Sequence, residues 1–188
     1  MPWSDEIDTP TRRRARLLYE RGRHLFNIDQ FDKALAAFRE AINADGDFLP
    51  ARCGKVYAFV MTNRAAAALA EADRVIARDA SFAPAHTARA SALHRLGRLA
   101  EALAAHRLAV KLAPGESVVH YNFACFWAAE GNEGECKRHL TRAVALNPPA
   151  VTKARVEADF APYREKPWFK KLGRGGEPAI AVDGGHSN

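Results

Sequence analysis

Histidine and cysteine side chains are the residues of this 188-residue chain best suited to hold a metal or form a covalent intermediate. His86 and His94 lie on one predicted helix, but roughly 12 Å along its axis separates them, so they cannot share a metal ion. Four further histidines are expected to be isolated from one another by helix and by repeat: His24, His106, His120 and His139. No His-Glu-x-x-His spacing occurs, and the sequence predicts no metal site.

The three cysteines, Cys53, Cys125 and Cys136, are an odd number at wide spacings without a Cys-x-x-Cys pair. This pattern predicts neither a disulfide framework nor a zinc site. Cys125 could be a reactive thiol with His94 as a distant partner. We favour a packed cysteine, because nothing nearby is arranged to lower its pKa.

The carboxylates and glycines also suggest no reaction. Glu133 and Glu135 are predicted at the solvent side of a helix start, where they favour the helix dipole and lack the burial that acid–base chemistry needs. The glycines of residues 173–176 lack the strand and helix that give a phosphate-binding loop its function. We therefore expect no catalytic residue, no cofactor and no enzymatic activity.

The composition, 48% apolar and 27% charged with scattered Val, Ile and Thr, favours an all-α protein. The net charge is +6, and the one dense basic cluster is Arg12, Arg13, Arg14 and Arg16. We interpret this cluster as a solvated helix start, with a phosphate-binding patch as the open alternative. No stretch approaches the roughly 20 apolar residues that span a bilayer, and no signal-peptide segment is seen, so we expect a cytoplasmic protein.

The elements that position these residues repeat along the chain. A shift of 34 residues superposes small and β-branched residues without a gap. The superposed positions are Ala34, Ala68, Ala102 and Cys136, then Ala41, Val75, Ala109 and Ala143, then Ile42, Ile76, Val110 and Val144. Large apolar residues also align: Leu25, Phe59, Leu93 and Trp127. Each repeat therefore has the same internal layout.

Within each repeat, apolar residues recur at helical spacing in two blocks, which predicts two antiparallel helices. The breaks between the blocks are Asn27 to Gln30, Thr62 to Arg64, Gly97-Arg98 and Gly131-Asn132. Small residues such as Ala90 and Ala102 are expected where the two helices cross closely. A single hairpin cannot bury its apolar face alone, so stability must come from stacked neighbours.

These residues resemble the tetratricopeptide repeat family, whose units run about 34 residues with small residues at the hairpin crossing. Ala83 to Glu116 and Ser117 to Ala150 match most closely, and the repeat that contains Val56 diverges. The family's large apolar residue near the start of each repeat is Leu18 in the first and is replaced in the others by Arg52, His86 and His120. The resemblance implies a right-handed superhelical array of antiparallel helix hairpins.

The predicted organisation has four parts. Residues 1–11 are a flexible N-terminus, and residues 12–150 hold four repeats at about 15–48, 49–82, 83–116 and 117–150. Residues 151–172 form capping helices, with a turn at Ala161-Pro162 and aromatic residues that cover the end of the last hairpin. Residues 173–188 are predicted to be a disordered tail.

The resemblance also implies a concave groove lined by the first helix of every repeat, and helical geometry then places side chains in it. Aromatic and arginine side chains are enriched at binding hot spots, which favours a peptide ligand with an apolar anchor and a carboxylate. The alternative is that the tyrosines shield the core between repeats. The predicted groove residues are Tyr19, Arg23, Phe26, Cys53, Tyr57, Val60, Met61, Thr87, Ser91, His94, Arg95, Tyr121, Asn122 and Cys125.

Chaperone cofactors with this fold grip a partner's C-terminal carboxylate with Lys, Asn and Arg side chains. The matching positions here hold Tyr19, Arg23, Gly54, Pro84 and Ala88. That grip is therefore absent, although Arg23 could still pair with an acid.

We predict a non-enzymatic protein–protein interaction module, a scaffold, adaptor or assembly factor, that binds a peptide or helix of an unknown protein partner. A secretion-type or assembly chaperone is one alternative. A nucleic-acid-binding protein with a basic surface is another, which we rank lower. The sequence predicts no membrane span and leaves the oligomeric state open, a homo-oligomer included.

Overall fold

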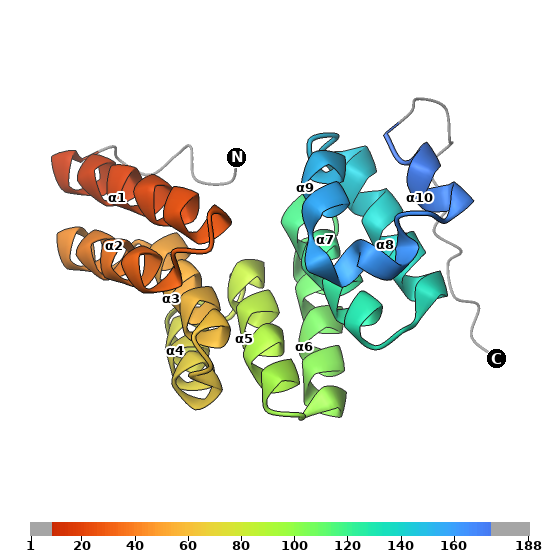
Figure 1. Cartoon of the computed structure of the whole chain (residues 1–188). Helices are drawn as coiled ribbons and strands as arrows, with labels where there is room; N and C mark the ends of the chain where they lie inside the picture. Colours follow the sequence, from red (N-terminus) through yellow and green to blue (C-terminus); the bar gives the residue numbers. More distant parts are fainter. Residues whose placement is uncertain (1–8, 174–188) are drawn as a thin grey trace. The chain divides into compact units, whose positions relative to one another are not determined.

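The computed structural model describes residues 9–173, and all regular elements in this range are helical (Figure 1). The helices are α1 (Pro10–Asn27), α2 (Phe31–Ala44), α3 (Leu49–Met61), α4 (Ala65–Arg78), α5 (Ala83–Arg95), α6 (Leu99–Leu112), α7 (Ser117–Ala129), α8 (Glu133–Leu146), α9 (Ala150–Val156), the 3₁₀ helix η1 (Ala158–Tyr163) and α10 (Pro167–Lys171). Consecutive helices α1–α2, α3–α4, α5–α6 and α7–α8 pair into hairpins, here numbered one to four. The all-α hairpin architecture predicted from the sequence is confirmed.

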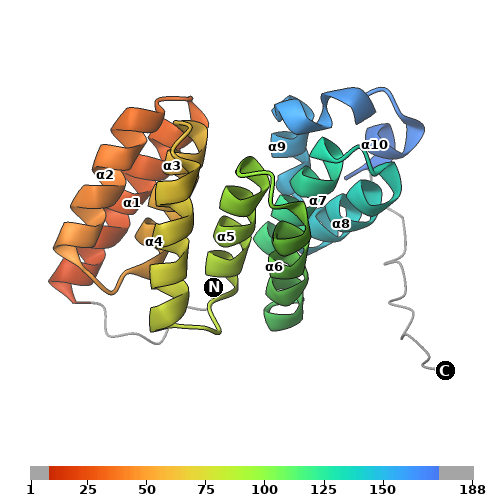
Figure 2. The ribbon, with the colours of Figure 1, turned by 90° about the horizontal axis from the view of Figure 1, so that it is seen from below.

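The chain divides into two compact units, of which the first ends at Ala113 and the second begins at Pro114. Unit 1 holds hairpins one to three, which pack in sequence through α2 with α3 and α4 with α5 (Figure 2). Unit 2 holds hairpin four and the C-terminal helices. The division falls between the third and fourth predicted repeats.

Helices α3, α5 and α7 begin at Leu49, Ala83 and Ser117, the first residues of three predicted repeats. Helix α1 begins earlier, at Pro10, because the Thr9 hydroxyl accepts a hydrogen bond from the Arg12 backbone amide and caps the helix. Residues 10 and 11 of the predicted flexible segment 1–11 are therefore helical. Residues 1–8 and all but the first residue of the predicted tail 173–188 lie outside the described residues.

Each hairpin turns through one residue with positive φ, at the same position of the repeat: Asp29, Asn63, Gly97 and Gly131. The following backbone amide then bonds the carbonyl five residues back, for example Arg98 N to Leu93 O at 2.9 Å and Asn132 N to Trp127 O at 2.9 Å. This is the Schellman arrangement, which satisfies the last carbonyls of a helix. The turns fall within the breaks predicted from the sequence.

The small residues of the repeat lie where helices cross. Ala34, Ala68, Ala102 and Cys136 are fully buried. In unit 1 the Phe38 ring lies between two glycines on different hairpins. A Cβ added to Gly22 would lie 2.5 Å from this ring, and one added to Gly54 would lie 2.6 Å from it. These glycines let α1 and α3 approach α2 closely.

The C-terminal helices of unit 2 pack on hairpin four. Phe160, Tyr163, Phe169 and Leu172 are buried in one cluster with α7 and α8 residues. The Trp168 indole also donates a hydrogen bond to the Glu133 carboxylate, at 2.9 Å. The predicted turn at Ala161-Pro162 is wrong in detail, because both residues belong to the 3₁₀ helix η1.

Candidate peptide-binding surface

The first helices of the hairpins in unit 1 lie next to one another, with α1 against α3 and α3 against α5. A hydrogen bond joins the Tyr57 hydroxyl on α3 to the Thr87 hydroxyl on α5, at 3.1 Å. Thr87 donates its own hydrogen to the Pro84 carbonyl, so Tyr57 is the donor. We call the surface formed by the predicted groove residues of these helices the α1/α3/α5 face.

The N-terminal part of the α1/α3/α5 face is closed by packing. Cys53 is 5% exposed and Thr87 is fully buried, so neither can contact a ligand in this structure, and we remove both from the predicted groove. The half-buried Tyr19 ring packs edge-on against Phe48, with 5.5 Å between ring centroids, and burial raises its pKa to about 12. Tyr19 thus partly shields the core, as the alternative interpretation held.

On α3 and α5 the exposure of the predicted groove residues increases toward the C-terminal end of the helix. Tyr57, Val60, Ser91 and His94 are half-buried, and the Ser91 hydroxyl bonds the Thr87 carbonyl at 3.2 Å. Met61 is 49% exposed, and Arg95, also exposed, forms no ion pair with another described residue. The two most exposed side chains of α3 and α5 on this face are therefore apolar and cationic, respectively.

Helix α1 adds Arg23 and Phe26 to this face. The Arg23 guanidinium lies 5.8 Å from the Tyr19 ring centroid and pairs with the exposed Glu20 carboxylate at 3.0 Å. The half-buried Phe26 ring contacts Phe31 edge-on, with centroids 5.2 Å apart. Arg23 can exchange its exposed partner for an acid of a ligand at small cost, since surface ion pairs contribute little.

In unit 2 the chain itself covers the corresponding residues of α7. Tyr121 is 5% exposed, with the Phe160 ring edge-on at 5.7 Å and the Lys153 ammonium 4.9 Å from its ring centroid. Tyr121 is therefore removed from the predicted groove. Asn122 and Cys125 are half-buried. Burial raises the pKa of the Cys125 thiol well above its ordinary value, which favours the packed cysteine over the reactive thiol.

The expectation that the histidines are isolated is wrong for two of them. His120 Nδ1 lies 3.0 Å from His139 Nδ1, and both side chains are buried. The two residues are on opposite helices of hairpin four. Sequence reasoning missed the contact because it compared histidines along each helix and not across the hairpin.

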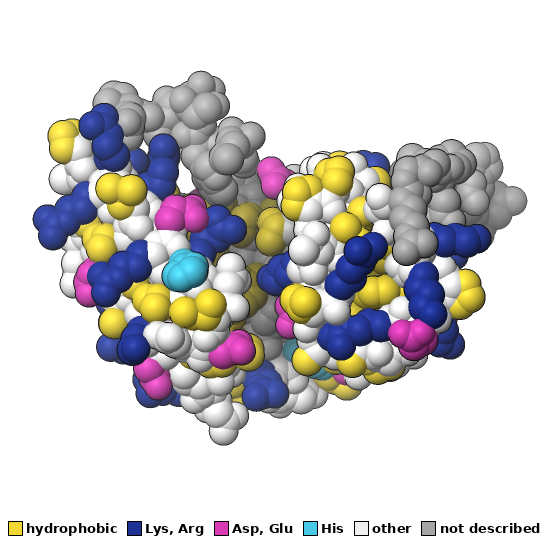
Figure 3. Space-filling model, turned by 45° about the horizontal axis from the view of Figure 1, so that its top comes forward, with side chains coloured by type: hydrophobic (Ala, Val, Ile, Leu, Met, Phe, Trp, Pro, Cys, Tyr) yellow, Lys and Arg dark blue, Asp and Glu magenta, His cyan; other side chains and the backbone are white. Residues whose placement is uncertain are grey.

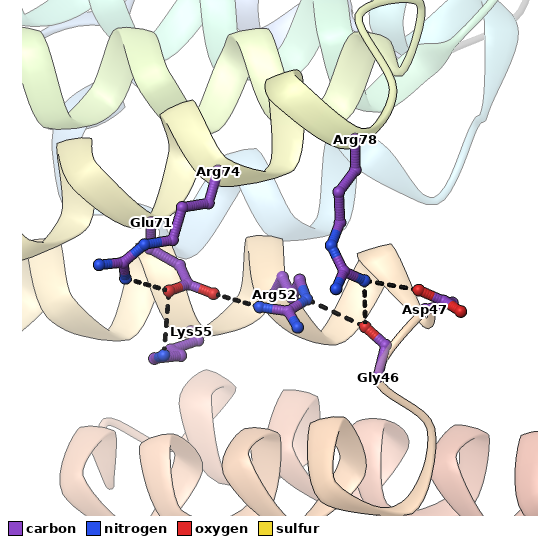
Figure 4. A network of polar contacts seen from close by, with 7 residues as sticks. All are labelled: Gly46, Asp47, Arg52, Lys55, Glu71, Arg74 and Arg78. Atoms are coloured by element: carbon purple, nitrogen blue, oxygen red, sulfur yellow. Dashed lines mark hydrogen bonds and ion pairs between the residues drawn. The ribbon is translucent and has the colours of Figure 1, made fainter.

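The same two positions of the repeat form a contact in hairpin two. Arg52 on α3 donates to Glu71 on α4 at 3.0 Å, and its Nε donates to the Gly46 carbonyl at 3.1 Å (Figure 4). His86 and His120 likewise reach back six residues, to the carbonyls of Ala80 at 2.9 Å and Pro114 at 3.1 Å. The polar residues that replace Leu18 thus bind the turn between repeats. The 34-residue period could have predicted that these two positions are in contact, because the partner positions recur with the same period: Ala37, Glu71, Ala105 and His139.

Glu71 is a buried carboxylate, 2% exposed, with three cations around it. Lys55 lies 3.1 Å away, Arg52 3.0 Å and Arg74 3.2 Å (Figure 4). Burial alone would raise the pKa of Glu71, but the hydrogen bonds and charges of Lys55 and Arg52 outweigh burial and lower it. This network links α3, α4 and the loop before α3, so we interpret it as a set of ion pairs that stabilises the fold.

One arginine of the basic cluster near the N-terminus, Arg12, already has partners within unit 1. Arg12 Nε pairs with the Asp45 carboxylate at 3.1 Å, and its guanidinium lies 5.6 Å from the Phe48 ring centroid. Arg14 and Arg16 are exposed. On the face drawn in Figure 3, basic side chains are scattered among acidic and apolar ones. This arrangement favours the solvated helix start over a phosphate-binding patch.

Among the described residues, no group of three or more His, Cys, Asp and Glu residues could hold a metal ion. None of the described helices combines the length and apolar character needed to cross a membrane.

Comparison with known proteins identifies the fold. The family model described as "Tetratricopeptide repeat" matches residues 15–48 and 83–116. A thermophilic TPR protein of Thermus thermophilus is 17% identical over 79% of this chain and 92% of that one, with a TM-score of 0.61. The first TPR domain of human RPAP3 is 18% identical over 75% of this chain and 98% of that one, with a TM-score of 0.53.

The first TPR of Spaghetti (RPAP3) is described as bound to the HSP90 peptide SRMEEVD. It is 20% identical over 63% of this chain and 94% of that one, with a TM-score of 0.52. At these identities the likeness shows the fold alone. No curated protein sequence matches the chain.

Proposed function

Because the chain carries tetratricopeptide repeats, a fold of protein–protein interaction modules, we propose that its α1/α3/α5 face binds a peptide or helix of a partner protein. The observation that carries this proposal is the rise in exposure along the face. Its buried end holds Cys53 and Thr87, Thr87 is hydrogen-bonded to the half-buried Tyr57, and its open end presents Met61 and Arg95. A rigid base below an accessible apolar and cationic surface is the arrangement that lowers the entropic cost of binding.

The partner segment that fits this surface has an apolar side chain close to an acidic one. Met61 and Val60 provide apolar contact, and methionine adapts its shape to varied ligands. Arg23 and Arg95 supply planar donors for a carboxylate. The RPAP3 domain binds an HSP90 peptide, but here Gly54, Pro84 and Ala88 occupy the places of the carboxylate grip. Binding would therefore rest on side chains along the partner segment and not on its terminal carboxylate.

The test is selection of a random-peptide display library on the full chain, followed by affinity measurement of the enriched peptides. The Met61→Glu, Arg95→Glu variant removes the apolar contact and reverses the cation at two exposed positions. The matched control is Leu17→Glu, Arg14→Glu, since both residues are exposed on α1 and point away from Tyr19. Both variants change the charge equally.

We expect enriched peptides with adjacent apolar and acidic residues, and at least about tenfold weaker binding by the Met61, Arg95 variant. The control variant should bind as the wild type does. Equal loss in both variants would mean that net charge drives binding and would contradict the proposal. The same surface could serve a scaffold, an adaptor or a chaperone.

Nucleic-acid binding is the alternative with a separate prediction. If exposed Arg14 and Arg16 bound phosphates, affinity for DNA or RNA would fall steeply with salt, and the Leu17, Arg14 variant would lose it. An absence of binding at low salt would exclude this alternative.

A further inference from the structure

The two buried histidines of hairpin four form a chain of hydrogen bonds with one consistent set of donors. His120 Nε2 lies 3.1 Å from the Pro114 carbonyl, which only accepts, so His120 carries its hydrogen on Nε2. Arg138 Nη2 lies 3.0 Å from His139 Nε2, and a guanidinium only donates, so His139 Nε2 is an acceptor. His139 then carries its hydrogen on Nδ1 and donates it to His120 Nδ1 at 3.0 Å.

This arrangement uses all the nitrogens of both neutral rings. Two ring nitrogens carry lone pairs, and both already accept hydrogen bonds. His120 Nδ1 accepts from His139 Nδ1, and His139 Nε2 accepts from Arg138. A further proton on His120 Nδ1 would set two N–H groups against each other at 3.0 Å. A further proton on His139 Nε2 would displace the Arg138 donor. Either position therefore breaks a bond that the neutral pair makes.

The surroundings also oppose a positive charge on the pair. Burial lowers the pKa of His120, and the cations Arg142 and Arg138 lower it further, whereas the Pro114 carbonyl acts in the opposite direction. The Phe123 ring packs on His139, with centroids 4.3 Å apart. Glu135 faces His139 Nε2 at 3.7 Å, but this carboxylate is already paired with Arg138.

We propose that the His120–His139 pair is a proton-sensitive lock on unit 2: while both rings are neutral it joins α7, α8 and the Pro114 carbonyl, and it opens as the solution becomes acidic. The proposal does not depend on the α1/α3/α5 face, which belongs to unit 1. Unit 2 should lose stability on acidification whether or not this face binds a partner.

The sign of the pH dependence follows from the direction of the shift. The folded-state pKa of His120 lies below the ordinary value of 6.5, so the unfolded chain binds the proton more tightly. The contribution of the pair is complete above about pH 6.5 and is lost as the pH falls below it. Below about pH 6.5, each proton that the chain takes up on unfolding lowers the folding equilibrium constant about tenfold for every pH unit of acidification.

The measurement must report on unit 2 alone, because unit 1 contains another buried histidine, His106. Burial lowers the pKa of His106 to about 3, so unit 1 also loses stability in acid. Trp127 and Trp168 both lie in unit 2, and Trp3 is the one other tryptophan of the sequence. In a Trp3→Phe background, tryptophan fluorescence therefore reports the unfolding of unit 2.

The first experiment is nitrogen NMR of the histidine rings in the full chain at about pH 7.5, where ¹⁵N shifts and ring couplings distinguish the tautomers. We expect hydrogen on Nε2 of His120 and on Nδ1 of His139. Assignment uses the loss of each signal set in single His→Gln variants. Any other tautomer pair, or a charged ring at this pH, would overturn the proposal. Because the tautomers are read from the wild-type rings, the result does not depend on the stability of any variant.

The second experiment is urea unfolding, followed by tryptophan fluorescence at about pH 7.5, 6 and 5. The His120→Leu, His139→Ala variant copies Leu18 and Ala37, the residues that hairpin one holds at the same positions. His24→Gln is the control, because His24 is exposed. We expect the unit 2 midpoint to fall with pH in the wild type and in the control, and to stay nearly constant in the Leu/Ala variant. Equal acid sensitivity in the Leu/Ala variant would overturn the proposal.

Discussion

Hairpins two and four place chemically different pairs at the same two positions of the repeat. In hairpin two the pair is ionic, with Arg52 bonded to the buried Glu71 carboxylate at 3.0 Å. In hairpin four the pair is His120 and His139, whose Nδ1 atoms lie 3.0 Å apart and which we propose to be neutral. Hairpin one carries the apolar residues Leu18 and Ala37 there. The position thus accepts any pair that fills the space and satisfies its own polar atoms.

The two polar pairs differ most in what happens when one member is removed. Glu71→Ala would leave the part-buried Arg52 and Lys55 without their carboxylate. We expect a loss of about 3–5 kcal/mol in the free energy of unfolding, measured by urea denaturation at neutral pH. The Arg52→Leu, Glu71→Ala double variant, which copies hairpin one, should recover part of this loss. A single variant as stable as the wild type would show that the cluster is not structural.

The neutral pair should depend less on its partner. His139→Ala alone removes the donor to His120 Nδ1 and leaves that buried nitrogen without a hydrogen. We expect a loss of about 1–3 kcal/mol at pH 7.5, measured by urea denaturation. A loss as large as that of Glu71→Ala would mean that the histidine pair carries charge in the folded state.

Exchanging the pairs should move the pH at which unit 2 weakens. The His120→Arg, His139→Glu variant retains Arg142, which occupies the position of Arg74 relative to Glu71. A carboxylate whose pKa is lowered on folding, as in Glu71, contributes stability above its ordinary pKa of 4.5 and loses it as the pH falls below that. We expect the acid weakening of unit 2 to begin below about pH 4.5 in place of about 6.5, as followed by tryptophan fluorescence. An unchanged onset would locate the acid response elsewhere.

The turns of the two hairpins should contribute the smallest difference. Asn63 and Gly131 both adopt positive φ, at 58° and 71°. A Cβ at Gly131 would meet nothing within 4 Å, so Gly131→Asn adds only backbone strain that asparagine tolerates. We expect a change of less than about 1 kcal/mol by urea denaturation. A larger change would mean that the turn, and not the side-chain pair, distinguishes the hairpins.

Much of the helical framework could be predicted from the sequence alone. The 34-residue period placed the turns at Asp29, Asn63, Gly97 and Gly131, and it placed small residues at the helix crossings. These features are local or belong to one hairpin, because a helix end is satisfied by amides within a few residues of it. The apolar residues of the C-terminal segment were also readable, since an array must cover its open end.

The candidate site was predicted less well. Helical spacing placed Met61 and Arg95 in the predicted groove, and both side chains are exposed in the structure. It put Cys53 and Tyr121 there too, and both are buried. Spacing on one helix says which residues share a side of it, but the neighbouring elements decide which of these reach solvent. For Tyr121 these neighbours are α9 and η1, which follow hairpin four in the chain.

The repeat period, the helical hairpins and the chemical type of the residue at each repeated position could all be derived from the order of the amino acids. Which residues meet became known only from the packed helices: Arg52 contacts Glu71, and His120 contacts His139. The reason is that periodicity reports which positions are equivalent, whereas a hydrogen bond depends on the distance between atoms of different helices. That distance is set only when the two helices of a hairpin have packed.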